Sequence, residues 1–485
     1  MFDDQQGGLR VLLEVVPRPS LLAAIDEDAN LAGNPNAAEQ LSRAGMVVDA
    51  DWTALRLGPP PNGGKSTLTR RPRFDMVRET VNKVGDVVNK VGGALPMVDM
   101  QIPTWSPPER RTVLFRASLP LGDAAEQALA VATERAEVVG VYNDPPVALA
   151  HRRHTDSSHG NAERVGELMS CDRLRDQGLT GNGVVVAVVD AGINMEYLHG
   201  RGRRNELDGS LSYVAPMSDH SAGDFPVGHG TLCAFQVGIA APDARLADHA
   251  VILDPAETDG EPLMQAWLSD IEPGYVKLHR HLSELDLPDR RLVVSNSWAM
   301  IHPDWDYPSE HVQNFSDNPE HPFNRMVRAL IDLGADVLFA AGNCGQPYPV
   351  GGCGFRSQPI CGANALEEVI TVGAVDIDGE RLGYSSQGPG RIVAEKPDLC
   401  GYSHYAGSGI YYADWGTSTA CPGVAGVVAA VRSRYSPAEL PPYALKDALL
   451  RSAHPADGHH SPDMGYGVID PARMLERLRS LVGGV

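Results

Sequence analysis

Residues 184 to 192 read Val-Val-Val-Ala-Val-Val-Asp-Ala-Gly, a continuous apolar run that ends in a single carboxylate. Runs of this kind, with no alternation of polar and apolar residues, are typical of strands buried on both faces of a parallel sheet. Open parallel sheets form their sites at the carboxyl ends of the strands. The stretch therefore predicts an α/β domain with Asp190 at the functional edge of its sheet.

Two glycine-containing stretches carry the other polar groups that such a site needs. Residues 228 to 231 read Gly-His-Gly-Thr and open a helical stretch, while residues 416 to 420 read Gly-Thr-Ser-Thr-Ala and precede a run of small residues. A serine hydroxyl is a poor nucleophile until a histidine takes its proton, and the imidazole needs a carboxylate to fix its tautomer. Asp190, His229 and Ser418 supply these groups, so the pattern favours nucleophilic acyl transfer.

A fourth stretch supplies a donor for the oxyanion that acyl transfer creates. Residues 336 to 343 read Asp-Val-Leu-Phe-Ala-Ala-Gly-Asn, a second apolar strand that ends in a side-chain amide. With these motifs in the chain order Asp, His, Ser, the sequence resembles the subtilisin-like (subtilase) family of serine proteases over about residues 166 to 479. The resemblance implies a mostly parallel sheet flanked by helices, with Asn343 and the Ser418 backbone N–H as the oxyanion donors.

The resemblance also implies where substrate lies. Residues 292 to 298, Leu-Val-Val-Ser-Asn-Ser-Trp, are similar to the family's substrate-binding edge strand, which pairs with an extended peptide through backbone hydrogen bonds. The implied substrate-binding residues are Ser295, Ser297, Trp298, Ala299, Ala341 and Gly342. Two segments interrupt the domain: residues 255 to 289 are charged and helix-prone, and residues 301 to 322 could form a wall of the cleft or a solvated insertion.

The first 150 residues carry a divided βαβ pattern. Strands are predicted over residues 9–15, 46–57, 112–117 and 138–147, with helices within 20–43 and 123–136. Two βαβ halves predict a ferredoxin-like α+β domain, residues 1–150, with an insert at 58–110. Subtilases commonly carry a propeptide of this fold, so the resemblance implies that the N-terminal domain is an intramolecular inhibitor. A generic binding or oligomerisation domain is the alternative.

Residues 151–165 are predicted to be a linker to the catalytic domain, residues 166–485. The stretch from 148 to 160 is polar and rich in histidine, as expected of a cleavage site, and the Arg152-Arg153 pair marks one candidate bond. An uncut linker that holds a permanent regulatory domain is an equal alternative.

Composition limits the partners. The chain has 41 basic and 62 acidic residues, a net charge of −21, which argues against a nucleic-acid partner. The N-terminus has no basic segment before an apolar core, and no stretch approaches the roughly 18 apolar residues of a membrane span, so we expect a cytoplasmic protein with no membrane partner. Seven cysteines, an odd number, fit a reducing compartment. The three in one loop, Cys344, Cys353 and Cys361, are expected to be free thiols, with one disulfide or a metal site as alternatives.

The sequence thus predicts a serine endopeptidase that acts on protein or peptide substrates, uses no cofactor or metal, and is gated by its N-terminal domain. The oligomeric state is left open. The rival from another class is a catalytically silent or gated module that binds peptides in the same cleft and acts by recruitment. A hydrolase of esters is a third possibility, against which the predicted peptide-binding strand argues.

Overall fold

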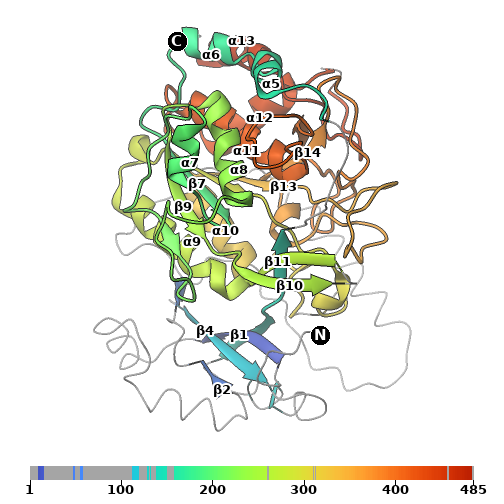
Figure 1. Cartoon of the computed structure of the whole chain (residues 1–485). Coiled ribbons are helices and arrows are strands. Elements are labelled where there is room, and N and C mark those ends of the chain that lie inside the picture. The colour runs from blue at the N-terminus through green and yellow to red at the C-terminus, as the bar shows by residue number, and fades with distance from the viewer. Residues whose placement is uncertain are drawn as a thin grey trace.

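The computed structural model describes residues 9–15, 47–49, 55–57, 112–119, 128–129, 132, 138–149, 158–258, 261–309, 311, 313–455 and 458–482. Its larger part is an α/β domain with helices on both faces of a central sheet (Figure 1). A smaller sheet from the first part of the chain lies at one end of this domain, at the bottom of the view.

The central sheet has seven strands in the order β15-β14-β13-β12-β7-β9-β8, and every pairing in it is parallel. The strands are β7 (Val185–Asp190), β8 (Tyr213–Val214), β9 (Arg245–Ala250), β12 (Leu292–Asn296), β13 (Asp336–Ala340), β14 (Ile370–Val375) and β15 (Leu399–Tyr402). Along β7, Val186 and Val188 join the core on one face, whereas Val185, Ala187 and Val189 join the core on the other. Burial on both faces explains the unbroken apolar run, and the predicted parallel sheet is confirmed.

Helices cover both faces of this sheet. The core on one face includes α8 (His229–Ala240) and α11 (Thr417–Arg432), and the core on the other includes α9 (Leu268–Glu284) and α10 (Pro322–Asp332). A Cβ added at Gly426 of α11 would lie 2.5 Å from the Val237 carbonyl oxygen of α8, so the small residues of α11 allow the two helices to approach closely. The remaining α-helices of the described residues are α5 (Ala162–Leu168), α6 (Cys171–Asp176), α7 (Met195–Gly200), α12 (Pro442–Ser452) and α13 (Pro471–Val482).

The first part of the chain forms an antiparallel sheet with its own apolar core. Its strands are β1 (Leu9–Val15), β2 (Val47–Val48), β3 (Leu55–Leu57), β4 (Thr112–Leu119) and β5 (Val138–Asn143). The order β2-β4-β1-β5 separates the two parallel strands of each half by a strand of the other half. This strand order, with these directions, is that of the ferredoxin-like fold, as predicted. The helix predicted within 20–43 and the insert at 58–110 lie outside the described residues.

One predicted strand is divided between two sheets. The sequence predicts a single strand over 138–147, whereas β5 ends at Asn143 and β6 (Pro146–Leu149) joins β11 (Glu261–Trp267) and β10 (Asp254–Thr258) in a three-stranded antiparallel sheet. The break has a physical cause, because the Asp144 carboxylate turns away to accept hydrogen bonds from Ser269 N and Oγ, at 2.9 and 2.7 Å. Pro145 and Pro146 then provide no N–H for a sheet ladder. The chain therefore passes from the N-terminal sheet into a sheet of the larger domain.

The segment predicted to be helix-prone, residues 255 to 289, is helical only in its second part. Its first part is the β10–β11 hairpin, and α9 begins at Leu268. Among the described residues, no helix is both long enough and apolar enough to cross a membrane.

Candidate active site

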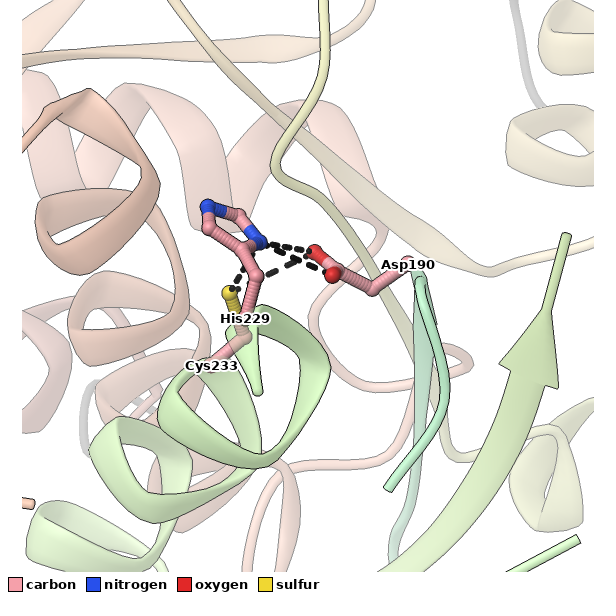
Figure 2. A group of neighbouring side chains, drawn as sticks. All are labelled: Asp190, His229 and Cys233. Atoms are coloured by element: carbon pink, nitrogen blue, oxygen red, sulfur yellow. Dashed lines mark hydrogen bonds and ion pairs between the residues drawn. The ribbon is translucent and has the colours of Figure 1, made fainter. Parts of the chain in front are cut away.

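Asp190 and His229 lie next to each other at the carboxyl edge of the central sheet. Asp190 is the last residue of β7, and His229 is the first residue of α8. The His229 Nδ1 atom lies 2.8 Å from Asp190 Oδ1 and 3.0 Å from Oδ2, and both side chains are buried (Figure 2). A carboxylate in this position favours the tautomer with the proton on Nδ1, which makes Nε2 the basic nitrogen.

Ser418 lies in the first turn of α11, where its Oγ donates to the Ser297 carbonyl oxygen at 3.3 Å. Cys233 lies one turn along α8 from His229. Its thiol contacts Asp190, His229 and Ser418. Its Sγ lies 3.4 Å from Asp190 Oδ2 and 3.7 Å from His229 Nδ1, and it donates to the Ser418 carbonyl oxygen at 3.4 Å. The Asp190 carboxylate, the His229 ring and the backbone carbonyl oxygen of Ser418 thus all lie beside one thiol.

Asn343 follows β13 and faces the start of α11. Its Oδ1 accepts hydrogen bonds from Thr417 N at 2.9 Å and Thr417 Oγ1 at 3.0 Å. These donors fix the oxygen toward the helix and leave the Nδ2 group for another acceptor. A Cβ added at Gly416 would lie 3.2 Å from Asn343 Nδ2, so the amide lies beside the turn that carries Ser418.

Ala341 and Gly342 make the connection between β13 and Asn343. The Ala341 N–H donates to Val372 of β14 at 2.9 Å, so Ala341 continues the sheet. Gly342 leaves it with a φ of +91°, in the left-handed region that favours glycine, and its N–H donates to Thr417 Oγ1 at 3.1 Å. This turn directs Asn343 to α11.

The predicted substrate strand needs a correction. Strand β12 pairs with β7 on one side and with β13 on the other, so it lies inside the sheet and has no free edge for a peptide. Ser295 is fully buried within it, with its Oγ 3.9 Å from Cys421 Sγ. The expectation of a free edge strand is therefore wrong, whereas the substrate-binding role of Ser295 stays a prediction that its burial does not favour. Backbone pairing with an extended segment is found only after the strand ends, at Ala299.

A peptide segment already occupies that position. Ala148 of β6 exchanges two backbone hydrogen bonds with Ala299, at 2.9 and 3.2 Å. On its other side β6 pairs with β11, where Ala148 lies opposite Gln265. The tail of the N-terminal domain is therefore held between two segments of the larger domain. Val147, Ala148 and Leu149 are at most 2% exposed.

The sequence motifs gave no indication of a role for Cys233. Together with Asp190 and His229 it forms the one group of three potential metal ligands found among the described residues, with donor atoms within 4.8 Å of one another (Figure 2). Burial, and next the charge of Asp190, raise the pKa of the Cys233 thiol well above its usual range. A metal ion would have to displace the proton that joins Asp190 to His229, so these residues fit a triad better than a resident metal site.

Asp248 of β9 is a second residue that the sequence analysis missed. Its Oδ2 accepts hydrogen bonds from Ile193 N at 3.1 Å and Gly223 N at 2.8 Å, which ties the loop after Asp190 to the loop before His229. Burial is the main reason that the pKa of its carboxyl is raised to about 7; the hydrogen bonds from Gly223 and Ile193 oppose this shift, and the charge of Asp190 adds to it. The signal in the sequence was a carboxylate within a short stretch that also contains Leu246, Ala247 and Ala250.

A disulfide follows Asn343 directly. Cys344 and Cys353 are joined, whereas Cys361 is a buried free thiol. The expectation of free thiols is therefore wrong for the first two, and one disulfide, the alternative, is found. Proximity decided the pairing, because the loop between them turns back and its Val350 N–H donates to the Asn343 carbonyl oxygen at 2.9 Å. Disulfides are typical of oxidising compartments, so the cytoplasmic location stays a prediction that this bond does not favour.

Comparisons with known proteins identify a family model and several proteases to which this chain is similar. A sequence model described as the subtilase family of peptidases matches residues 181–468. Site-1 protease of Homo sapiens, described as a membrane-bound transcription factor protease, is 27% identical over 334 residues, which cover 65% of this chain and 27% of that protein. Serine protease AprX of Bacillus subtilis is 30% identical over 243 residues, covering 46% of this chain and 47% of that protein.

A calcium-dependent protease of Nostoc sp. is 26% identical over 377 residues, covering 66% of this chain and 49% of that protein. The chain thus spans about a quarter of the length of site-1 protease and about half of the other two. Among solved structures, MycP1 with its N-terminal propeptide removed gives a TM-score of 0.44 at 20% identity, covering 64% of this chain and 96% of that one.

Proposed function

Because the chain belongs to the subtilase family, we propose that it is a serine endopeptidase whose catalytic triad is Asp190, His229 and Ser418. The observation that carries the proposal is the 2.8 Å contact between His229 Nδ1 and Asp190, beside the helix turn of Ser418. That contact orients the imidazole so that Nε2 can take a proton from a serine hydroxyl.

In the proposed reaction, Ser418 Oγ attacks the scissile carbonyl carbon and passes its proton to His229 Nε2. Asp190 stabilises the resulting imidazolium, and His229 then gives the proton to the leaving amine. The Asn343 Nδ2 group and the Ser418 N–H donate to the oxyanion of the tetrahedral intermediate. In the second half of the reaction, His229 Nε2 takes a proton from a water molecule, which attacks the acyl carbon. His229 then returns the proton to Ser418 Oγ as the ester bond breaks.

We propose that residues 1–150 inhibit this site, that 151–165 form a linker and that 166–485 form the catalytic domain. Ion pairs support docking of the N-terminal domain: Arg325 lies 2.8 Å from Glu14, and Arg116 lies 2.8 Å from Asp270. The pairing of Ala148 with Ala299 supports inhibition, because a substrate would need the same backbone groups.

The register of this pairing also suggests a cleavage site. In an antiparallel pair, the residue two positions after the partner of Ala299 faces Ser297, whose carbonyl oxygen accepts from the nucleophile Ser418. Ala150 is two positions beyond Ala148 in the sequence, and its own placement lies outside the described residues. We therefore propose that autoprocessing cuts the Ala150–His151 bond, before the Arg152-Arg153 pair.

The test compares casein degradation and intact mass for the wild type, Ser418→Ala and a matched control. Ser452→Ala is the control, because Ser452 is also buried but bonds only within α12, to Ala448 at 2.7 Å. We expect the wild type and the control to degrade casein and to release a fragment beginning at His151, and Ser418→Ala to do neither.

Each other outcome has a meaning. Binding of casein without cleavage by the wild type would replace the endopeptidase with the recruitment module. Casein degradation by a chain that stays full length would replace maturation with a permanent regulatory domain. A new terminus after Arg153 would contradict the register.

A further inference from the structure

The Asn364 side chain connects two segments of the candidate active site, one at Trp298 and one at Ala340. Asn364 lies in a short 3-10 helix, η4 (Gly362–Ala365), and is 2% exposed. Its side chain approaches two backbone carbonyl oxygens, that of Trp298 at 3.1 Å and that of Ala340 at 2.8 Å. Because both partners are acceptors, the Nδ2 group is the one that faces them, and its two hydrogens serve one carbonyl each.

The two carbonyls belong to segments with different proposed roles. Trp298 lies between Ser297, whose carbonyl accepts from Ser418 Oγ, and Ala299, which pairs with the bound peptide segment. Ala340 ends β13, three residues before Asn343. One amide group therefore spans from the peptide-binding segment to the strand that leads to the oxyanion donor.

Asn364 is itself anchored. Its carbonyl oxygen accepts a hydrogen bond from Thr371 Oγ1 of β14 at 2.6 Å, and Thr371 Oγ1 in turn accepts from Lys396 Nζ at 2.9 Å. The Asn364 main chain is therefore attached to strand β14 of the central sheet. A side chain held at both ends can fix a spacing, whereas a free one would follow whichever segment moved.

We propose that Asn364 is a positioning residue, which sets the distance between the peptide-binding segment at Trp298 and the oxyanion donor that follows Ala340. The inference rests on the proposed endopeptidase function. Acyl transfer needs the oxyanion of the tetrahedral intermediate at about 2.7–3.1 Å from its donors, and a displacement of about 1 Å costs roughly a hundredfold in rate. A peptide is placed along its length by Ala299, so its carbonyl reaches Asn343 only if the two segments keep their spacing.

This role predicts a dependence on substrate length. Asn343 is held by Thr417, without Asn364, so the oxyanion donor should stay beside Ser418 when Asn364 is changed. A small ester that never contacts Ala299 should then react normally. A peptide that pairs with Ala299 should be held in the wrong place for attack.

The test measures kcat and KM of Asn364→Ala for a tetrapeptide anilide, Val-Ala-Leu-Ala, and for p-nitrophenyl acetate. We expect kcat for the peptide to fall at least tenfold with a smaller change in KM, and the ester rate to change less than twofold. Asn364→Ser, which keeps a shorter donor, should give an intermediate loss and serves if the alanine variant does not fold.

Asn205→Ala is the matched control, because Asn205 is also buried and its Nδ2 also bridges two carbonyls, of Ala241 and Ala244, each at 2.8 Å. It should leave both rates within twofold. Equal losses on peptide and ester, or no loss on either, would overturn the inference. If instead the wild type cleaves no peptide at all, the proposed function fails, and the two failures are thus distinguishable.

Discussion

Gly416 controls the space around the proposed oxyanion donor. Its φ of +88° lies in the region that favours glycine, and an added Cβ would lie 3.2 Å from Asn343 Nδ2. We expect Gly416→Ala to displace the Asn343 amide and to lower kcat on a peptide by roughly a hundredfold, the order seen when an oxyanion donor is lost. Steady-state kinetics on a peptide anilide checks this.

Gly178→Ala separates this effect from backbone strain. Gly178 has a similar φ of +74°, and its added Cβ would meet nothing within 4 Å. The control should lose stability but keep its kcat. An equal fall in kcat for both variants would show that strain, and not the displaced amide, causes the loss.

Asp248 predicts a pH dependence of stability. Burial raises the pKa of its carboxyl from the ordinary value of 3.8 to about 7, so the folded protein holds this proton more tightly than the unfolded chain. A raised pKa stabilises the fold fully below pH 4, and the contribution is lost as the pH rises through 7. We expect Asp248→Asn to remove this loss, on the order of 3 kcal/mol between pH 4 and 8.

The measurement is the free energy of unfolding against pH, by denaturant titration in a Ser418→Ala background that prevents self-digestion. If the free energy of unfolding varies with pH in the same way with Asp248 and with Asp248→Asn, a buried carboxyl that titrates near neutrality is refuted.

The residues of the candidate site fall into two groups. Some have positions that a local sequence motif predicts, and others have positions that depend on partners far away in the sequence. Asp190, His229, Ser418 and Asn343 could be predicted because each stands at a strand end or a helix start within its own local motif. Asn364 could not, because its meaning depends on carbonyls 24 and 66 residues away that only the fold brings together. The position of Cys233 could not be predicted for the same reason, since its contact with Ser418 arises from the approach of α11 to α8.

At the scale of elements, the loop from Cys344 to Cys353 carries a prediction of its own. The disulfide joins residues 9 apart, immediately after Asn343. Closing a loop of this size restricts the unfolded chain, so Cys344→Ser with Cys353→Ser should lower the free energy of unfolding by about 2–3 kcal/mol. Denaturant unfolding, with and without reductant, measures this in the Ser418→Ala background.

Cys361→Ser is the control, since Cys361 is buried and free. Reductant should destabilise the chain with the Cys361 change and leave the double variant unaffected. Equal sensitivity of both chains to reductant would contradict the pairing.

A strand with the same surroundings along its whole length was predicted correctly, whereas a segment divided between two sheets was not. The run of β7 has the same buried surroundings throughout, so its pattern indicated a parallel strand correctly. The predicted strand over 138–147 failed because Asp144 pairs with Ser269, a residue 125 positions away, and starts a new sheet. Similarly, β10 and β11 are stabilised by pairing with the tail in β6, which the charged composition of that segment did not indicate.

At the scale of the whole molecule, docking of the N-terminal domain should depend on pH. Glu272 of α9 is fully buried, and burial followed by the charges of Asp144 and Asp270 raises the pKa of its carboxyl, while Arg325 and Arg116 oppose this less strongly. Asp144 and Arg116 belong to the N-terminal domain, so docking itself contributes to the shift. Because the charge of Asp144 raises this pKa more than Arg116 lowers it, docking takes up a proton at Glu272, and this contribution to docking weakens as the pH rises through the docked-state pKa.

Hydrogen exchange of the Val147–Leu149 amides in the Ser418→Ala chain measures this docking directly. Protection, corrected for the intrinsic pH dependence of exchange, should fall with rising pH, and Glu272→Gln should flatten the change. Protection that rises with pH in the chain with Glu272 would contradict the assignment.

The proposed reaction requires that Asp190 and His229 activate Ser418 as a nucleophile. The most direct measurement is the labelling rate of the full-length chain by diisopropyl fluorophosphate, which is small enough to react without occupying the peptide-binding segment, followed by peptide mapping of the adduct. We expect one adduct, on Ser418, formed at least a hundredfold more slowly in His229→Ala and absent in Ser418→Ala. Labelling of another residue, or equal rates with and without His229, would contradict it.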